Sequence, residues 1–182
     1  MNRKFFFIMM IILLTLIGAG YWASSHKGEK TIEGAIEKTG RRGSNIIYQE
    51  KVNGGVVVFT KRITGDASTI DSGYVKKGLL GWKWIWGGGF SGYSVQYFQA
   101  IPGTPFPMLI GDINNERISL VKITDVEHNY SKEVKIVGTG NDRIWFTFLN
   151  KSDGPSFEIV SLSNTDKVLD SRSIDIRNNT SF

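Results

Sequence analysis

The chain contains no cysteine, two histidines and four prolines among its 182 residues. Without cysteine it forms no disulfide, has no thiolate metal ligand and has no cysteine nucleophile. A cysteine-free chain fits a bacterial extracytoplasmic protein but does not establish the compartment. The length predicts one domain or two small ones. A hydrophobic content of 41% is enough for a packed core, so we do not expect a disordered chain.

Few residues are arranged for catalysis or metal binding. His26 and His128 have no partner at the spacing of metal ligands, so we predict no metal and no cofactor. Ser24–Lys27 matches Ser-x-x-Lys and Lys38–Gly40 matches Lys-Thr-Gly, but the Ser-Asp-Asn motif that accompanies them in penicillin-binding enzymes is absent. We therefore name no catalytic residue and favour a protein that is not an enzyme.

One long hydrophobic run lies at the N-terminus. Residues 5–22 carry no charge, and they follow Arg3 and Lys4. As a helix this run would reach about 27 Å, which is close to the thickness of a bilayer core. We predict that residues 1–25 form a transmembrane or signal-anchor helix. The alternative is a signal peptide whose cleavage releases a secreted protein.

Charge places the rest of the chain, residues 26–182, outside the cytoplasm, because Arg3 and Lys4 mark the inner side of a single-pass anchor. Residues 29–105 carry ten basic and six acidic side chains, whereas residues 106–182 carry nine and eleven. The basic surplus near the membrane predicts attraction to an envelope polymer or to anionic lipid. A protein partner is the alternative, and a membrane tether argues against nucleic acid.

The body of the chain predicts a mainly β domain, all-β or α+β, built as an antiparallel sandwich or a barrel-like domain. One short helix is expected over Thr31–Gly40, with Thr31 as its N-cap. Asn53-Gly54 indicates a hairpin, and the continuous apolar run Val56–Phe59 is typical of a central strand. The proline-rich segment 101–107 is a candidate boundary between two halves. The expected strands are residues 46–51, 56–62, 70–77, 82–86, 93–100, 108–113, 117–124, 133–138, 143–149, 156–161 and 167–176.

The stretch Gly78–Phe90 is unusual because it holds three of the five tryptophans and a triple glycine. On a strand, side chains alternate between faces, so we expect Trp82, Trp84 and Trp86 on one face and Lys83 on the other. The glycines are expected to form a turn. Two interpretations stay open: the stripe fills the core, which the opposite-facing lysine favours, or it is an exposed platform for a sugar ring, a wall glycan or the membrane interface. The candidate binding residues are Trp82, Lys83, Trp84, Trp86 and Tyr93.

Three features give the chain a resemblance to small membrane-anchored extracytoplasmic proteins of spore-forming Gram-positive bacteria. They are the short helix with Ile32, Ala35 and Ile36, the Asn53-Gly54 hairpin into Val56–Phe59, and Gly81–Trp84 followed by the triple glycine. The resemblance covers most of the chain and implies a location at the cell membrane rather than an activity, since those proteins have none assigned.

We therefore predict a membrane-tethered extracytoplasmic domain that binds or interacts with an unknown ligand. One alternative is an enzyme, or an accessory to one, that acts on cell-envelope glycan with Trp82, Trp84 and Trp86 as subsites. A second alternative is an immunity or inhibitor-type surface protein.

Overall fold

The computed structural model describes residues 3–25, 27–64, 67–90 and 95–178. Within these ranges the chain forms two α-helices, a short 3-10 helix (Gly140–Asp142) and three antiparallel sheets of four strands each. The prediction of a mainly β domain is confirmed. The sheets pack on one another through shared hydrophobic cores, as in a sandwich.

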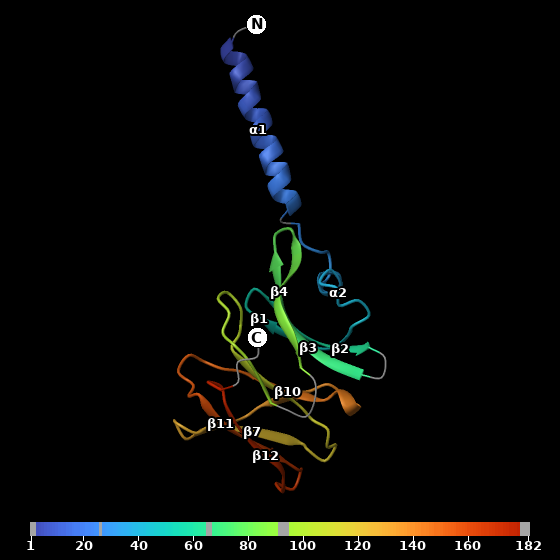
Figure 1. The fold of residues 1–182 in the computed structure, drawn as a ribbon, viewed down its shortest axis with the longest axis vertical. Helices are drawn as coiled ribbons and strands as arrows, with labels where there is room; N and C mark the ends of the chain where they lie inside the picture. The colour runs from blue at the N-terminus through green and yellow to red at the C-terminus, as the bar shows by residue number, and fades with distance from the viewer. Residues whose placement is uncertain (1–2, 26, 65–66, 91–94, 179–182) are drawn as a thin grey trace.

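The first element, α1 (Arg3–Ser25), projects away from the β sheets (Figure 1). Its described side chains are those of residues 7–18, 20 and 21, and the large apolar ones among them are exposed. Within the described part of the chain, we find no helix that has both the length and the apolar character needed to cross a membrane.

The second helix, α2 (Ile32–Glu37), is the short helix expected from the sequence. The Thr31 side chain accepts a hydrogen bond from a first-turn N–H at 3.0 Å, which confirms the predicted N-cap. The helix ends before Gly40, which adopts a φ of 85° in the turn that follows. So short a helix is unstable alone, and the burial of Ala35 and Ile36 on the neighbouring sheet keeps it folded.

Sheet A lies beside α2 and contains the first four strands in chain order. They are β1 (Asn45–Val52), β2 (Gly55–Thr64), β3 (Ala67–Gly78) and β4 (Gly81–Phe90). The predicted hairpin between β1 and β2 is confirmed, with Gly54 at a φ of 78°. Val57 and Phe59 of β2 pack toward the middle of the molecule, whereas Val56 and Val58 pack toward α2. Burial of both faces explains the continuous apolar run in this strand.

Sheets B and C contain the remaining strands. The order in sheet B is β5 (Gln96–Phe98), β6 (Met108–Asp112), β10 (Ile144–Phe148) and β9 (Lys135–Val137); the order in sheet C is β12 (Val168–Asp175), β11 (Ser156–Leu162), β7 (Leu120–Asp125) and β8 (Tyr130–Glu133). The segment 101–107 connects β5 to β6, which pair with each other. The proline-rich candidate boundary therefore lies between two neighbouring strands of one sheet.

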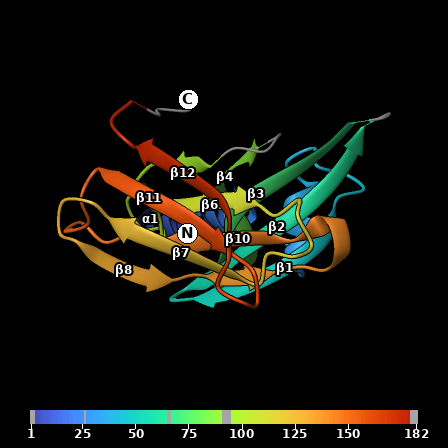
Figure 2. The ribbon, with the colours of Figure 1, turned by 90° about the horizontal axis from the view of Figure 1, so that it is seen from below.

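The molecule is layered, with sheet B in the middle (Figures 1 and 2). One hydrophobic core joins sheets A and B through residues such as Phe59, Met108 and Phe146. A second core joins sheets B and C through Leu109 and Trp145 together with residues of β7 and β11. A third, smaller core lies between sheet A and α2. Sheet B is thus buried on both faces.

Strand β8 was missed from the sequence, since none of the expected strands covers residues 125–132. The turn occupies residues 126–129, and the chain then pairs with β7 from Tyr130 onward. Between β8 and β9, the Val134 N–H donates to the Val121 carbonyl at 3.0 Å, so one bent ribbon passes from sheet C into sheet B. This ribbon joins the two sheets covalently as well as through their shared core.

Candidate functional site

The three tryptophans of β4 do not share a face. The pairing with β3 passes from Trp84 to Trp86 without a partner for Ile85, which marks a β-bulge. Trp82 and Trp84 pack on the α2 side of sheet A, whereas Trp86 packs on the sheet B side. The prediction of a single stripe is therefore wrong, because the bulge interrupts the two-residue alternation of the strand.

Trp86 is part of the core between sheets A and B. Its ring centroid lies 5.3 Å from that of Phe98 and 5.0 Å from that of Phe106. Both contacts are edge-to-face, with interplanar angles of 83° and 73°. This geometry is favoured by aromatic quadrupoles and stabilises a packed core. Of the two interpretations of the tryptophans, packing in the core is the one that holds for Trp86.

Trp84 rests on glycine. A Cβ atom on Gly73 would lie 2.0 Å from the Trp84 ring, and one on Gly87 would lie 2.3 Å from it. Only glycine leaves room for the indole at these two positions, which pair with each other across β3 and β4. Gly87–Gly89 therefore continue β4, and the turn expected at the triple glycine is wrong.

A cavity of about 260 Å³ opens beside Trp82 and Trp84. Its walls come from the tether after α1, from α2 with its following turn, and from β4. The lining residues are Lys27, Gly28, Glu29, Ala35, Lys38, Thr39, Trp82, Lys83 and Trp84. Three lysines against one glutamate give the cavity a positive balance, and the two indoles give it an aromatic wall.

The tether is held in place by a β-bridge to Trp82. The Glu29 N–H donates to the Trp82 carbonyl at 2.7 Å, and the Trp82 N–H donates to the Glu29 carbonyl at 2.8 Å. The Glu29 carboxylate accepts a hydrogen bond from Lys38 Nζ at 2.8 Å, and this contact lowers the pKa of Glu29. The bridge and the ion pair together close one side of the cavity.

Arg41 forms a polar layer behind Trp84. Its guanidinium lies 4.7 Å from the centroid of the Trp84 ring, and it donates a hydrogen bond to Thr39 Oγ1 at 2.9 Å. Its Nε atom is 4.0 Å from Asp71 Oδ2, and Arg62 Nε is 3.4 Å from the same oxygen. Asp71 is only 2% exposed, whereas the Arg62 side chain is 41% exposed, so water shields the carboxylate little and Arg62 more.

Several buried polar atoms around Asp71 lack a hydrogen-bond partner among the described residues. They are Arg41 Nε, Arg62 Nε, Asp71 Oδ2 and Thr60 Oγ1. Leaving such a group unpaired costs about 1–3 kcal/mol. Two guanidinium groups face one carboxylate here, so the layer carries a net positive charge. It therefore reinforces the positive balance of the cavity.

The structure brings together three of the five candidate binding residues, since Trp82, Lys83 and Trp84 line the same cavity. Trp86 lies on the other face of sheet A, and Tyr93 lies outside the described residues. Sequence reasoning missed the remaining charged groups, which are Lys27, Glu29, Lys38, Arg41, Arg62 and Asp71. Asp71 lies inside the expected strand 70–77, where an aspartate is unusual, and a buried carboxylate needs partners.

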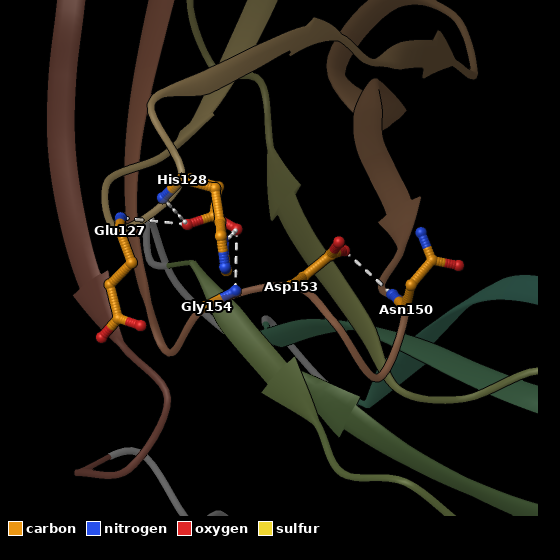
Figure 3. Close-up of polar contacts among 6 residues, drawn as sticks. Glu127, His128, Asn150, Asp153 and Gly154 are labelled. Carbon is orange, nitrogen blue, oxygen red and sulfur yellow. Dashed lines mark hydrogen bonds and ion pairs between the residues drawn. The ribbon is translucent and has the colours of Figure 1, made fainter.

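Asp125 organises a second polar cluster with Glu127, His128 and Gly154, which are labelled in Figure 3. Its carboxylate accepts hydrogen bonds from the N–H groups of Gly154 at 2.7 Å, Glu127 at 3.1 Å and His128 at 3.2 Å. The ring Nδ1 of His128 lies 2.8 Å from Asp125 Oδ2. The Gly154 hydrogen bond is the main reason that the pKa of Asp125 falls to about 2, and the carboxylate in turn raises the pKa of His128.

An aspartate–histidine pair is also found in hydrolase triads, where the histidine faces a nucleophile. Here His128 belongs to the same turn that Asp125 closes, and its side chain is 56% exposed. Gly154 comes from the loop before β11, so Asp125 fastens that loop to the β7–β8 turn (Figure 3). We therefore assign the pair to loop stability.

Another cavity, of about 210 Å³, lies at the end of the core between sheets B and C. Two carboxylates line it, those of Asp112 and Asp170. Asp170 accepts a hydrogen bond from Arg172 Nε at 2.7 Å, and Asp112 accepts one from the Asn114 amide at 2.8 Å. Each carboxylate is thus engaged by a neighbour.

Within the described residues, no group of three or more histidine, aspartate or glutamate side chains could hold a metal ion. Comparison with known proteins finds no matching family model, no matching curated protein and no matching solved structure. The function is therefore argued from the geometry of the site itself.

Replacing Gly73 by alanine tests whether the Trp84 ring packs on the backbone at this position. The new Cβ would overlap the indole, so we expect Gly73→Ala to lower the free energy of unfolding by roughly 1–3 kcal/mol and to expose Trp84. Denaturant unfolding and tryptophan fluorescence of the full chain in detergent micelles measure both effects. Gly78→Ala is the matched control in the same hairpin, because its nearest neighbour atom would be 3.5 Å away. An equal loss of unfolding free energy in the two variants would contradict the packing of Trp84 on Gly73.

Replacing Asp125 by asparagine tests the loop cluster. The pKa of Asp125 is about 2, below its ordinary value of 3.8, so its charge stabilises the fold above about pH 4 and this contribution is lost as the pH falls toward 2. At neutral pH we expect Asp125→Asn to lower the free energy of unfolding by roughly 1–2 kcal/mol. The difference from the parent chain should shrink as the pH falls from about 4 to about 2, as measured by denaturant unfolding.

His128 adds a second pH range with the opposite sign. Its pKa is raised above 6.5, so its charged form stabilises the fold below that pH, and the contribution is lost as the pH rises through the raised pKa. Asp125→Asn should remove most of this dependence, because Asp125 is the main cause of the raised pKa and Glu127 and Asp153 contribute less. Asp153→Asn, on the same loop, is the control, since its carboxylate accepts one exposed hydrogen bond from the Asn150 N–H at 2.9 Å. A parent-like acid profile in Asp125→Asn would rule out the assigned role.

Proposed function

We propose that the chain is a membrane-tethered extracytoplasmic domain that binds an anionic polymer of the cell envelope in the cavity beside Trp82 and Trp84. The observation that carries this proposal is the convergence of three lysines from three different elements on one aromatic wall. Lys27 comes from the tether, Lys38 from the end of α2 and Lys83 from β4. Like charges held close together repel one another and destabilise the folded chain, and a bound anion would relieve this repulsion.

The lining suits a polymer with repeated negative groups. Lysine ammonium groups pair with phosphate or carboxylate, and the indoles of Trp82 and Trp84 offer flat apolar surfaces to sugar rings or alkyl carbons. Arg41 and Arg62 add a second layer of positive charge behind Trp84. Lys27 and Lys38 of the lining are exposed to solvent, so a ligand can reach the cavity without entering the core.

The tethering is proposed from the sequence of α1. Residues 5–22 are uncharged, and the large apolar side chains described within this run are exposed. A helix that is apolar on all sides needs an apolar environment around it, and a bilayer provides one. With Arg3 and Lys4 on the inner side, residues 26–182 lie outside the cytoplasm.

The other functions suggested by the sequence stay predictions. An envelope-glycan enzyme or accessory would retain Trp82 and Trp84 as subsites, since Trp86 packs in the core. Such an enzyme would need a pair of working carboxylates, and Asp112 and Asp170 line a different cavity on the far side of sheet B. An immunity or inhibitor-type role would need a protein ligand at the tryptophan cavity.

Polymer binding is tested with the full chain in micelles of a neutral detergent. Polyphosphate is the probe, uncharged dextran is the comparison, and tryptophan fluorescence reports binding. We expect Lys38→Gln/Lys83→Gln to weaken polyphosphate binding by about tenfold or more, because charge-assisted contacts are lost. Trp84→Phe should remove most of the fluorescence response.

The matched control is Lys151→Gln/Lys167→Gln, which removes the same charge from exposed positions in the second half of the chain. This variant should bind polyphosphate within a factor of about two of the parent chain, since only long-range attraction changes. Equal loss in both double variants, or equal binding of dextran and polyphosphate, would overturn the proposed site.

A further inference from the structure

The tip of the β3–β4 hairpin carries apolar side chains that no described part of the chain covers. Leu79 is 106% exposed and Leu80 is 43% exposed. Ile85, pushed out by the β-bulge, is 43% exposed. The three line an apolar hollow of about 250 Å³ together with the stems of Lys76 and Lys83. Grouped apolar exposure of this kind marks a surface that binds a membrane or another molecule.

Positive charge surrounds this apolar tip. Lys76 and Lys83 are direct cross-strand partners, an arrangement of like charges that destabilises a hairpin in water. Lys77 lies next to them, with its ammonium 5.5 Å from the centroid of the Trp82 ring. A leucine tip ringed by lysines matches the two layers of an anionic membrane surface, where acyl chains lie beneath negative headgroups.

The tip is fastened next to the end of α1. The Gly28 N–H donates to the Leu80 carbonyl at 2.9 Å. Only two residues lie between Gly28 and Ser25, the last residue of α1, so the two positions are at most about 11 Å apart. The hairpin tip and the end of α1 are accordingly side by side (Figure 1).

Two glycines make this attachment close. A Cβ on Gly28 would lie 2.5 Å from the backbone of Gly81, and a Cβ on Gly81 would lie 2.5 Å from the Glu29 carbonyl oxygen. Gly81 also has a φ of 118°, which side-chain-bearing residues rarely adopt. The tether and the hairpin are thus in backbone contact, which fixes the direction of the tip relative to the tether.

We propose that the Leu79–Leu80 tip inserts into the headgroup region of the same bilayer that holds α1, with Lys76 and Lys77 on anionic phospholipid headgroups. The inference rests on the proposed anchoring of α1 and adds a second membrane contact to it. Two contacts fix the orientation of the domain, whereas a single helix with a tether would leave it free to swing. The tryptophan cavity is then held at a constant height above the membrane.

The absence of cysteine allows a direct test, because single cysteines can be introduced and labelled with a polarity-sensitive fluorophore. The full chain is reconstituted in phosphatidylcholine vesicles with or without phosphatidylglycerol, and nitroxide lipids quench the fluorophore at known depths. Leu79→Cys reports the tip, and Leu14→Cys reports α1. Val168→Cys is the control, being 55% exposed at the start of β12 in the layer farthest from α1 (Figure 1).

We expect shallow nitroxides to quench the label at position 79, deep nitroxides to quench the label at position 14, and neither to quench the label at position 168. Lys76→Gln/Lys77→Gln should lower the ratio of docked to undocked tip about fivefold for each lysine removed, and omission of phosphatidylglycerol should act in the same direction.

The outcomes separate the two proposals. Quenching at position 14 without quenching at position 79 overturns the docking of the tip and leaves the anchor standing. No quenching at position 14, together with failure to float with vesicles, overturns the anchor itself. Quenching at position 79 that is indifferent to both the lysine substitutions and the anionic lipid overturns the pairing of the lysines with headgroups.

Discussion

Burial of sheet B on both faces is the constraint on which the rest of the structure depends. Adjacent residues of β6 point in opposite directions, so Met108 and Ile110 enter the core with sheet A while Leu109 enters the core with sheet C. An apolar strand of this kind cannot be solvated on either side, and it therefore fixes the other two sheets around it. The outer faces of sheets A and C are what remain available for function.

The outer face of sheet A is apolar, because it carries Val56, Val58 and Val75, and these side chains must be shielded from water. The cover comes from a very short helix, two half-buried tryptophans and a tether, which together are too small to seal the face. The cavity is the part left open. This explains why the residues that line the candidate site are also those that complete the smallest core, and why polar groups such as Arg41 and Asp71 lie directly beneath it.

Sequence patterns were informative wherever one residue type decides the local structure, as with the Thr31 cap, the turn at Gly54 and the doubly buried Val56–Phe59. Sequence patterns failed where the local structure of one strand depends on its pairing with a neighbouring strand. The bulge at Ile85 is a property of the pairing between β3 and β4, and no pattern within β4 alone reveals it. The triple glycine had the same difficulty, because its fit to the Trp84 ring depends on Gly73 across the sheet. The candidate site was accordingly half predicted, in Trp82, Lys83 and Trp84 but not in its other charged residues.

The contact between the tether and β4 decides how the two proposals relate. Glu29 bridges Trp82 by its backbone and Lys38 by its carboxylate, so the tether is a wall of the cavity as well as the link to α1. Were the N-terminal segment removed as a signal peptide, Gly28 could still pair with the hairpin and the cavity would keep its shape, but nothing would hold the leucine tip at a bilayer. Ligand binding can therefore survive without the anchor, whereas a fixed orientation at the membrane cannot.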